Sequence, residues 1–313
     1  MTPGKARRIQ TVADSRGVFK ILAADHRDSM RALIDPDHPE DVPASTLTDI
    51  KLAVIRGVGA MASGVLLDPV YSAQQAIVSG ALSGQVGFLS AIEEQGYLGD
   101  PHSRQTTLLT GWSVEKAARL GASGIKLLIF YNPNAGDAAD RQDELVSAVV
   151  ADCARYDIPL FLEPLGYPLE SQPYDREQVT IETARRLSAL HPDVLKLQFP
   201  VDGRQESSPE TWQESCAKLA EACAVPWALL SFGDPYDLFK AQLEVACEAG
   251  CSGFMAGRAV WREVITAPAG ERAPIVGKIV LPRFKGLCEV VDRHAAPWTT
   301  KADPPDHVPY HQF

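Results

Sequence analysis

Lys196 has the setting that most clearly suggests chemistry. It stands inside the short apolar run Asp193-Val194-Leu195-Lys196-Leu197-Gln198-Phe199-Pro200, which Pro200 closes. Such a run is typical of a strand that is buried on both faces in a parallel sheet. Burial disfavours the ammonium form and lowers the pKa of a lysine, so the neutral amine becomes available as a nucleophile toward a carbonyl carbon. A salt-bridged lysine at a strand end would give the same pattern without chemistry.

A second lysine and two carboxylates occupy comparable positions. Lys126 lies inside another apolar run, and Asp25 and Glu163 stand near the ends of two further runs. Clustered cations lower one another's proton affinity, so we expect Lys126 to stay charged while Lys196 loses its proton more readily. The two carboxylates are of the kind that move protons when a carbinolamine forms or a carbon–carbon bond breaks. Salt bridges to the lysines would explain either carboxylate equally well.

The elements that must position these residues alternate between strands and helices. Apolar runs typical of strands begin at residues 19, 64, 87, 124, 159, 194, 227 and 253, so one strand-helix unit repeats about every 33 residues. Helical segments are expected at 45–62, 210–223, 236–249 and 273–294. The pattern predicts an α/β fold, a single (β/α)8 TIM barrel over residues 1–294, with a short N-terminal helix across one end and an extended C-terminal tail at 295–313.

In a barrel of this kind the active site lies at the carboxyl ends of the strands. Polar residues at the ends of six predicted strands would converge on one mouth, which favours the closed barrel over an open doubly wound sheet or two domains. Backbone N–H groups and an arginine bind phosphate, and barrels commonly supply them after strands seven and eight. Ser231, Gly233, Gly257 and Arg258 meet this requirement. Taken singly, each glycine would also suit a tight turn, and Arg258 a surface salt bridge.

Composition excludes several classes of protein. The formal net charge is −10 and the pI is near 5.2, whereas nucleic acids and anionic membranes bind basic surfaces. No apolar run approaches the roughly 20 residues of a membrane helix, and no signal core follows the first residues. The six cysteines form no C-x-x-C pair, so we expect reduced, packed thiols. We expect a cytoplasmic homo-oligomer without nucleic-acid or membrane partners.

The histidines do not indicate a metal site. A catalytic zinc needs about three histidine or acidic ligands, and the seven histidines stand far apart at 26, 38, 102, 191, 294, 307 and 311. His307 and His311 share a spacing of four, but Pro309 lies between them. We therefore expect neither a metal nor another cofactor. We interpret His26 as a hydrogen-bonding group in the site or as a packed strand-end residue.

Several short motifs follow one another in a specific order and spacing. They are Asp25-His26-Arg27, Gly96-Tyr97-Leu98-Gly99-Asp100-Pro101, Gly111-Trp112-Ser113-Val114-Glu115-Lys116, Gly124-Ile125-Lys126-Leu127-Leu128, Leu162-Glu163-Pro164, Asp193-Val194-Leu195-Lys196 and Gly253-Phe254-Met255-Ala256-Gly257-Arg258-Ala259-Val260-Trp261. From about residue 15 to residue 293 the chain resembles the class I tagatose 1,6-bisphosphate aldolases and the related sulfofructose phosphate aldolases.

The resemblance implies a metal-independent cleavage of a ketose 1,6-bisphosphate to dihydroxyacetone phosphate and glyceraldehyde 3-phosphate. It implies that Lys196 is the Schiff-base lysine, Lys126 the assisting lysine and Glu163 the carboxylate that transfers protons. Asp25 would bind hydroxyl groups of the sugar, and Arg27 its other anionic end. The phosphate of the dihydroxyacetone phosphate half is expected at Ser231, Gly233, Gly257 and Arg258.

The chain departs from the family pattern at three positions. His26 replaces the usual glutamine, Gln198 a common glutamate, and Phe232 a small residue. Gln198 is expected on the same strand face as Lys196, where it removes a negative charge. His26 and Phe232 are expected to face the substrate. Alternatives are therefore an aldolase for sulfofructose 1-phosphate or another C6-modified ketose, and a sugar-phosphate-binding protein without catalysis.

Overall fold

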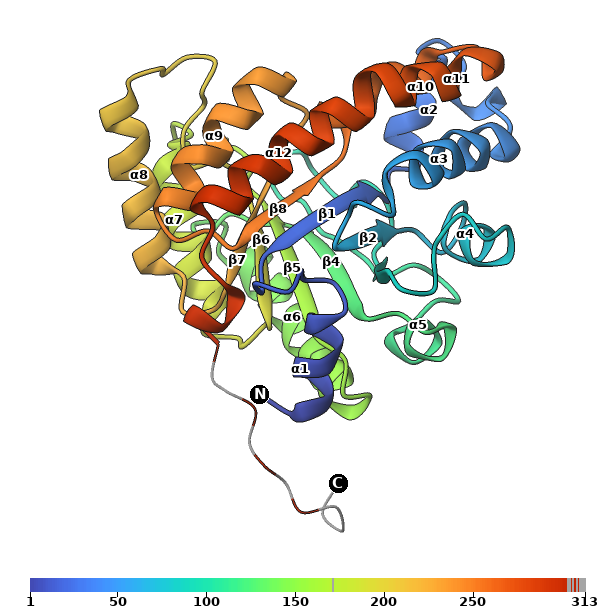
Figure 1. Cartoon of the computed structure of the whole chain (residues 1–313). Coiled ribbons are helices and arrows are strands. Elements are labelled where there is room, and N and C mark those ends of the chain that lie inside the picture. Colours follow the sequence, from blue (N-terminus) through green and yellow to red (C-terminus); the bar gives the residue numbers. More distant parts are fainter. Residues whose placement is uncertain (171, 303–304, 306, 308, 310–313) are drawn as a thin grey trace.

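Figure 1 shows the computed structural model of the chain, which describes all residues except 171, 303–304, 306, 308 and 310–313. Within these residues, eight parallel strands form a closed barrel in which each strand pairs with the next and β8 pairs with β1. This confirms the predicted TIM barrel. The strands are β1 Phe19–Ala24, β2 Gly64–Leu67, β3 Gly87–Ala91, β4 Gly124–Phe130, β5 Leu160–Leu165, β6 Val194–Leu197, β7 Trp227–Leu230 and β8 Gly253–Ala256.

The helices surround the barrel (Figure 1). They are α1 Pro3–Gln10, α2 Asp28–Ile34, α3 Ala44–Val58, α4 Ala73–Val78, α5 Val114–Leu120, α6 Asp137–Arg155, α7 Arg176–Ser188, α8 Pro209–Ala222, α9 Tyr236–Glu248, α10 Arg258–Thr266, α11 Ala269–Ile275 and α12 Leu281–His294, with 3-10 turns at Pro39–Asp41 and Trp298–Thr300. The single helix predicted at 273–294 is instead divided by a π-helical turn at Val276–Val280. Pro274 and Pro282 flank this turn, and neither has the N–H that continues an α-helix.

Alternation of side chains along the strands separates two apolar cores. Ile21 of β1 points into the barrel, where it belongs to the same cluster as Phe161. Leu22, the next residue, points outward and packs in the cluster between the barrel and its helices. The same alternation turns Lys196 inward, because it stands two residues after the inward-facing Val194.

The N-terminal helix and the start of the tail close one end of the barrel. Figure 1 shows α1 beneath the strands, and its buried Ala6 and Ile9 join the core inside the barrel. Trp298 is buried in the same core, and its backbone N–H donates to the carbonyl of Gly17 at 2.8 Å. The tail therefore begins as a packed 3-10 turn rather than as an extended segment. Most of its later residues lie outside the described part of the chain.

Among the described residues, no helix combines the length and the apolar character needed to cross a membrane.

Candidate active site

The carboxyl ends of the strands surround a cavity of about 300 Å³. All ten residues predicted for the site line this cavity, although six strands and the loops after them supply these residues. They are Asp25, His26, Arg27, Lys126, Glu163, Lys196, Ser231, Gly233, Gly257 and Arg258. The barrel thus brings together side chains that are up to 233 residues apart in the sequence, from position 25 to position 258.

Glu163 lies between the two lysines. Nζ of Lys196 donates a hydrogen bond to Oε2 of Glu163 at 2.8 Å, and Nζ of Lys126 forms a salt bridge to the same oxygen at 3.0 Å. All three side chains are buried. Oε2 of Glu163 therefore contacts both amines, and it is close enough to accept a proton from Lys196.

Lys126 also contacts two other carboxylates. Its Nζ lies 2.9 Å from Oδ2 of Asp25 and 2.6 Å from Oε1 of Glu93. Burial alone would lower the pKa of Lys126, but Asp25, Glu163 and Glu93 outweigh it and raise this pKa well above its ordinary value. Burial likewise disfavours the charged form of Asp25, yet Lys126 and Lys196 hold the pKa of this carboxyl below its usual range. Lys126 is therefore charged, as the sequence predicted.

Glu93 is a residue of the site that the sequence reasoning missed. It follows the apolar run Gly87-Phe88-Leu89-Ser90-Ala91-Ile92, which begins the third predicted strand unit, and the rule of polar residues at strand ends would have found it. Its Oε2 accepts a hydrogen bond from the backbone N–H of Leu128 at 3.1 Å, and burial raises the pKa of its carboxyl. We call Asp25, Glu93, Lys126, Glu163 and Lys196 the mouth cluster.

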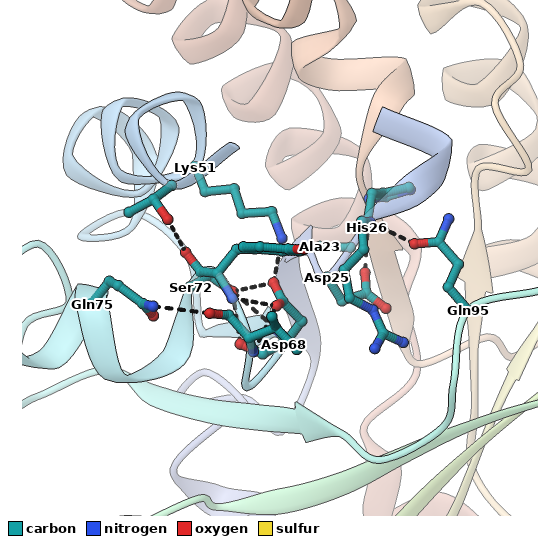
Figure 2. A network of polar contacts seen from close by, with 12 residues as sticks. Ala23, Asp25, His26, Lys51, Asp68, Ser72, Gln75 and Gln95 are labelled. Carbon is teal, nitrogen blue, oxygen red and sulfur yellow. Dashed lines mark hydrogen bonds and ion pairs between the residues drawn. The ribbon is translucent and has the colours of Figure 1, made fainter. Parts of the chain in front are cut away.

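The loop after β1 is held by the loop after β3. Oε1 of Gln95 accepts the backbone N–H groups of Arg27 and Asp28, each at 2.7 Å. Figure 2 shows Gln95 reaching this turn from the side opposite to Asp68. Nη2 of the buried Arg27 donates to the backbone carbonyl of Glu93 at 2.5 Å. Arg27 lines the cavity, but its guanidinium also fastens the two loops together.

His26 packs at the wall of the cavity as a neutral side chain. Its ring meets that of Trp261 edge to face, with centroids 5.7 Å apart. Burial lowers the pKa of His26 to about 3. Its buried Nδ1 has no hydrogen-bond partner among the described residues. The interpretation as a packed strand-end residue is therefore supported, while Nδ1 stays available to a ligand.

The ends of β7 and β8 form a corner around Arg258. The guanidinium of Arg258 lies against Gly233, whose φ of +77° favours glycine. Burial lowers the pKa of Arg258, and its buried Nε has no hydrogen-bond partner among the described residues. A buried donor without a partner is costly. This corner is therefore suited to an anion.

Phe232 has an unusual backbone conformation in this corner. Its φ is +46°, which is uncommon for a bulky residue, and its side chain lines the cavity. The guanidinium carbon of Arg176 lies 5.1 Å from the centre of the Phe232 ring, within the range of a cation–π contact. Arg176 thus holds this turn from the side of α7.

The prediction for Gln198 is wrong. It was expected on the face of Lys196, but β6 ends at Leu197 and the alternation of the strand ends there. Nε2 of Gln198 instead donates to Oγ1 of Thr180 in α7 at 2.9 Å. Gln198 is not among the residues that line the cavity.

A separate buried ion pair lies beside the site. Lys51 of α3 forms a salt bridge with Asp68, which follows β2 (Figure 2). Oγ of Ser72 donates to Oδ2 of Asp68 at 2.6 Å, and the N–H groups of Val70 and Tyr71 donate to its Oδ1 at 2.9 and 2.7 Å. Burial lowers the pKa of Lys51, although Asp68 opposes this effect. Neither Lys51 nor Asp68 lines the cavity.

Other polar and thiol groups lie away from the mouth. The six cysteines are free and buried, as predicted. In the described residues, the one group of three ionisable side chains close enough to share an ion is Glu244, Glu248 and His294. These residues stand on α9 and α12, not at the carboxyl ends of the strands.

A closed barrel whose mouth holds two buried amines, carboxylates and an unpaired arginine defines a class of barrel enzymes that act on carbonyl compounds through an amine. The comparison of sequences specifies the class further. A family model described as DeoC/LacD family aldolase matches residues 19–263. The chain belongs to this family, and it is an aldolase, a carbon–carbon lyase.

Curated relatives cover nearly the whole chain. The tagatose 1,6-diphosphate aldolase of Lactococcus lactis subsp. lactis is 26% identical over 96% of this chain and 99% of its own length. The tagatose 1,6-diphosphate aldolase of Streptococcus pneumoniae serotype 4 (strain ATCC BAA-334 / TIGR4) is 27% identical over 95% of this chain and 98% of its own length. The motifs that carry the resemblance therefore lie within a similarity that extends from end to end.

Solved structures share the fold. An archaeal fructose 1,6-bisphosphate aldolase has a TM-score of 0.61 at 20% identity, and the match covers 91% of this chain and 98% of the archaeal one. The fructose-bisphosphate aldolase of Plasmodium falciparum has a TM-score of 0.68 at 15% identity, with coverage of 94% and 97%. At these identities the likeness shows the barrel architecture alone.

Proposed function

We propose that this aldolase forms a Schiff base through Lys196 and cleaves a ketose 1,6-bisphosphate of the tagatose type to dihydroxyacetone phosphate and glyceraldehyde 3-phosphate. One observation carries the proposal: the buried amine of Lys196 shares a carboxylate oxygen with Lys126 inside the cavity that also holds Arg258. The curated relatives named tagatose 1,6-diphosphate aldolase support the choice of substrate.

The first step is attack of the neutral amine of Lys196 on the C2 ketone of the open-chain sugar. A nitrogen–carbon bond forms, the ketone oxygen takes a proton from the charged Lys126 to become a hydroxyl, and loss of water leaves a protonated imine. Glu163 takes a proton from the amine and returns it to the leaving hydroxyl, since its Oε2 lies 2.8 Å from Nζ. Lys126 holds this carboxylate in place through its own salt bridge.

The protonated imine then accepts the electron pair of the C3–C4 bond. A base removes the proton from the C4 hydroxyl, the three-carbon aldehyde leaves, and an enamine remains on Lys196. Protonation at C3 and hydrolysis of the imine release dihydroxyacetone phosphate and restore the amine. We assign these proton transfers to Glu163 with Lys126, and the binding of sugar hydroxyls to Asp25 and His26.

The C1 phosphate occupies the corner at β7 and β8. The unpaired Nε of Arg258 supports this placement, as does its position against Gly233. Arginine binds phosphate through planar, charge-assisted hydrogen bonds. Ser231 and Gly257 complete the corner. The phosphate accepts the hydrogen bond for which the buried Nε of Arg258 has no partner among the described residues.

A cleavage assay tests the function. Ketose 1,6-bisphosphates that differ in configuration at C3 and C4 are supplied, and dihydroxyacetone phosphate is detected by a coupled reduction. We expect turnover that a chelator does not inhibit, with a tagatose-type substrate preferred. Binding without turnover at high enzyme concentration would indicate a sugar-phosphate-binding protein instead. Loss of activity on chelation would contradict the Schiff-base mechanism.

The finer biochemical setting belongs to the same proposal. His26 and Phe232 line the cavity where the family usually has other residues, so ketoses with a C6 sulfonate are included in the assay beside those with a C6 phosphate. We further propose a cytoplasmic homo-oligomer that uses no metal, cofactor or nucleic acid. Gel filtration with light scattering would reveal a monomer if the oligomer is wrong.

A further inference from the structure

The proposed assignments give the substrate a direction across the mouth. Arg258 follows β8, Lys196 lies on β6, Glu163 on β5 and Lys126 on β4. Strands that are consecutive in the chain are neighbours in the barrel. A ketose whose C1 phosphate meets Arg258 and whose C2 carbon meets Lys196 therefore extends its remaining carbons over β5 toward β4.

The end of β4 and the loop after β3 form this far side of the cavity. Phe130, the last residue of β4, lines the cavity there. The loop folds back on itself through two antiparallel bridges, one between Glu93 and Leu108 and one between Leu98 and Gln105. We call residues 93–108 the β3–α5 hairpin.

The base of this hairpin is fixed to the catalytic groups. Glu93 accepts a hydrogen bond from Lys126 at 2.6 Å, and Gln95 accepts the N–H groups of Arg27 and Asp28. Gly96, the next residue, lines the cavity with a φ of +89°. The hairpin therefore has a fixed position beside the path of the substrate.

Arg104 of this hairpin is held by three aromatic rings. Its guanidinium carbon lies 4.7 Å from the ring centre of Tyr97, 5.4 Å from that of Phe130 and 5.3 Å from that of Tyr167. Its Nε donates to the backbone carbonyl of Pro101 at 2.8 Å. Such contacts orient a guanidinium without neutralising its charge.

Arg104 is not itself among the residues that line the cavity, but it packs on Phe130, which is, and its terminal nitrogens remain available. Among the described residues, Arg104 forms no salt bridge, and its single side-chain hydrogen bond comes from Nε. An oriented guanidinium with two free nitrogens matches the oxygens of a phosphate or a sulfonate. Arg27 lines the cavity, and its buried Nε has no hydrogen-bond partner among the described residues, but its Nη2 already donates to the Glu93 carbonyl. Arg27 is therefore the competing candidate for this anion.

We infer that Arg104 binds the anionic group at the C6 end of the substrate, whether a phosphate or a sulfonate. The inference rests on the proposed function, because the direction of the substrate follows from Schiff-base formation at Lys196. It assigns the second anion site to the β3–α5 hairpin, opposite the corner of Arg258. Arg104 then determines specificity for ketoses that are charged at both ends.

The test compares three substrates with one another in each variant. They are a ketose 1,6-bisphosphate, a ketose 1-phosphate with a C6 sulfonate, and a ketose 1-phosphate with a C6 hydroxyl. Arg104→Met removes the charge but keeps an apolar side chain against the rings. Arg104→Lys keeps the charge without the planar fork. Arg141→Met is the matched control, because Arg141 is an exposed arginine whose Nε donates to Gln105 of the same hairpin.

We expect Arg104→Met to lower kcat/KM for both C6-anionic substrates about 10- to 100-fold, mainly through KM. The effect on the C6-hydroxyl substrate should stay below about threefold, Arg104→Lys should lie between, and Arg141→Met should match the wild type. Equal losses for charged and uncharged substrates would assign Arg104 a structural role and overturn the inference. Undiminished preference for the charged substrates would also overturn it, and would point to Arg27.

A second measurement separates this inference from the function on which it rests. Borohydride trapping with dihydroxyacetone phosphate uses only the C1 half of the substrate, so it should give the same adduct in Arg104→Met as in the wild type. If the wild type gives no adduct, the proposed function fails. If both proteins give the adduct but the C6 preference is unchanged, only the role of Arg104 fails.

Discussion

The protein buries lysines in two different ways. Lys51 and Asp68 form a pair in which both side chains are fully enclosed, at 0% exposure. The mouth cluster instead joins two lysines to three carboxylates around an open cavity, and Glu163 serves both lysines at once. A one-to-one pair satisfies its own charges and has no access to a ligand. In the mouth cluster, Glu163 still has Lys126 as its cationic partner when Lys196 reacts with a carbonyl. Burial of a lysine is therefore not by itself a sign of catalysis.

The largest expected effect comes from removing the reactive amine of the mouth cluster. Lys196→Met should lower kcat by about a thousandfold or more, because no Schiff base forms. Its effect on folding should be small, since Glu163 keeps its salt bridge to Lys126 at 3.0 Å. The cleavage assay and urea unfolding measure the two quantities. Activity within tenfold of the wild type would refute the role of Lys196.

The enclosed pair should respond in the opposite way. Lys51→Met leaves Asp68 buried with no cation, so the free energy of unfolding should fall by about 3–5 kcal/mol. The double variant Lys51→Met with Asp68→Asn should recover part of this loss. The adduct with dihydroxyacetone phosphate should still form at Lys196 in the folded fraction. If Lys51→Met left stability unchanged, the comparison between the two sites would lose its basis.

A smaller effect is expected where the mouth depends on close packing. A Cβ at Gly257 would lie 2.6 Å from Cε1 of His26 and 2.9 Å from the carbonyl oxygen of Ala23. Gly257→Ala should lower the free energy of unfolding by about 1–3 kcal/mol and raise KM, because Arg258 follows directly. Gly270→Ala in α11 is the control, since nothing lies within 4 Å of its added Cβ. Equal stability and KM in the two variants would show that Gly257 has no packing role.

The smallest effect concerns His26, which adjoins the mouth cluster without adding charge. Burial, with Arg258, Lys196 and Lys51, lowers the pKa of His26 to about 3, although Asp25 opposes them. The unfolded chain takes up this proton near pH 6.5, so stability is fully present above that pH and is lost as the pH falls toward 3. His26→Gln should remove about 2 kcal/mol of this loss at pH 5. Unfolding curves at pH 7, 5 and 4 provide the measurement, and identical pH dependence in both proteins would contradict the assignment.

The strands and the cavity residues could be predicted because they follow from local patterns. Each apolar run formed a strand, and closure of the barrel brought its polar ends together. The sharing of Glu163 between two lysines could not be predicted, because it depends on side-chain distances across three strands. The role of Gln95 could not be predicted either, because it consists of hydrogen bonds between the loop after β3 and the loop after β1.

Other features needed the folded chain as well. Lys51 looks like a solvent-exposed helix residue, and nothing near it in sequence shows that Asp68 meets it inside the protein. Gln198 was misplaced because the strand pattern continued two residues too far. Trp298 closes the base of the barrel, although the prolines of the tail suggested an extended segment.

The most direct test of the account is to map the site of the Schiff base among the buried lysines. The protein is treated with borohydride and dihydroxyacetone phosphate, digested, and analysed by mass spectrometry. The account predicts one adduct, on Lys196, that is absent without the ketone. An adduct on Lys126 or Lys51, or no adduct at all in an active preparation, would contradict it.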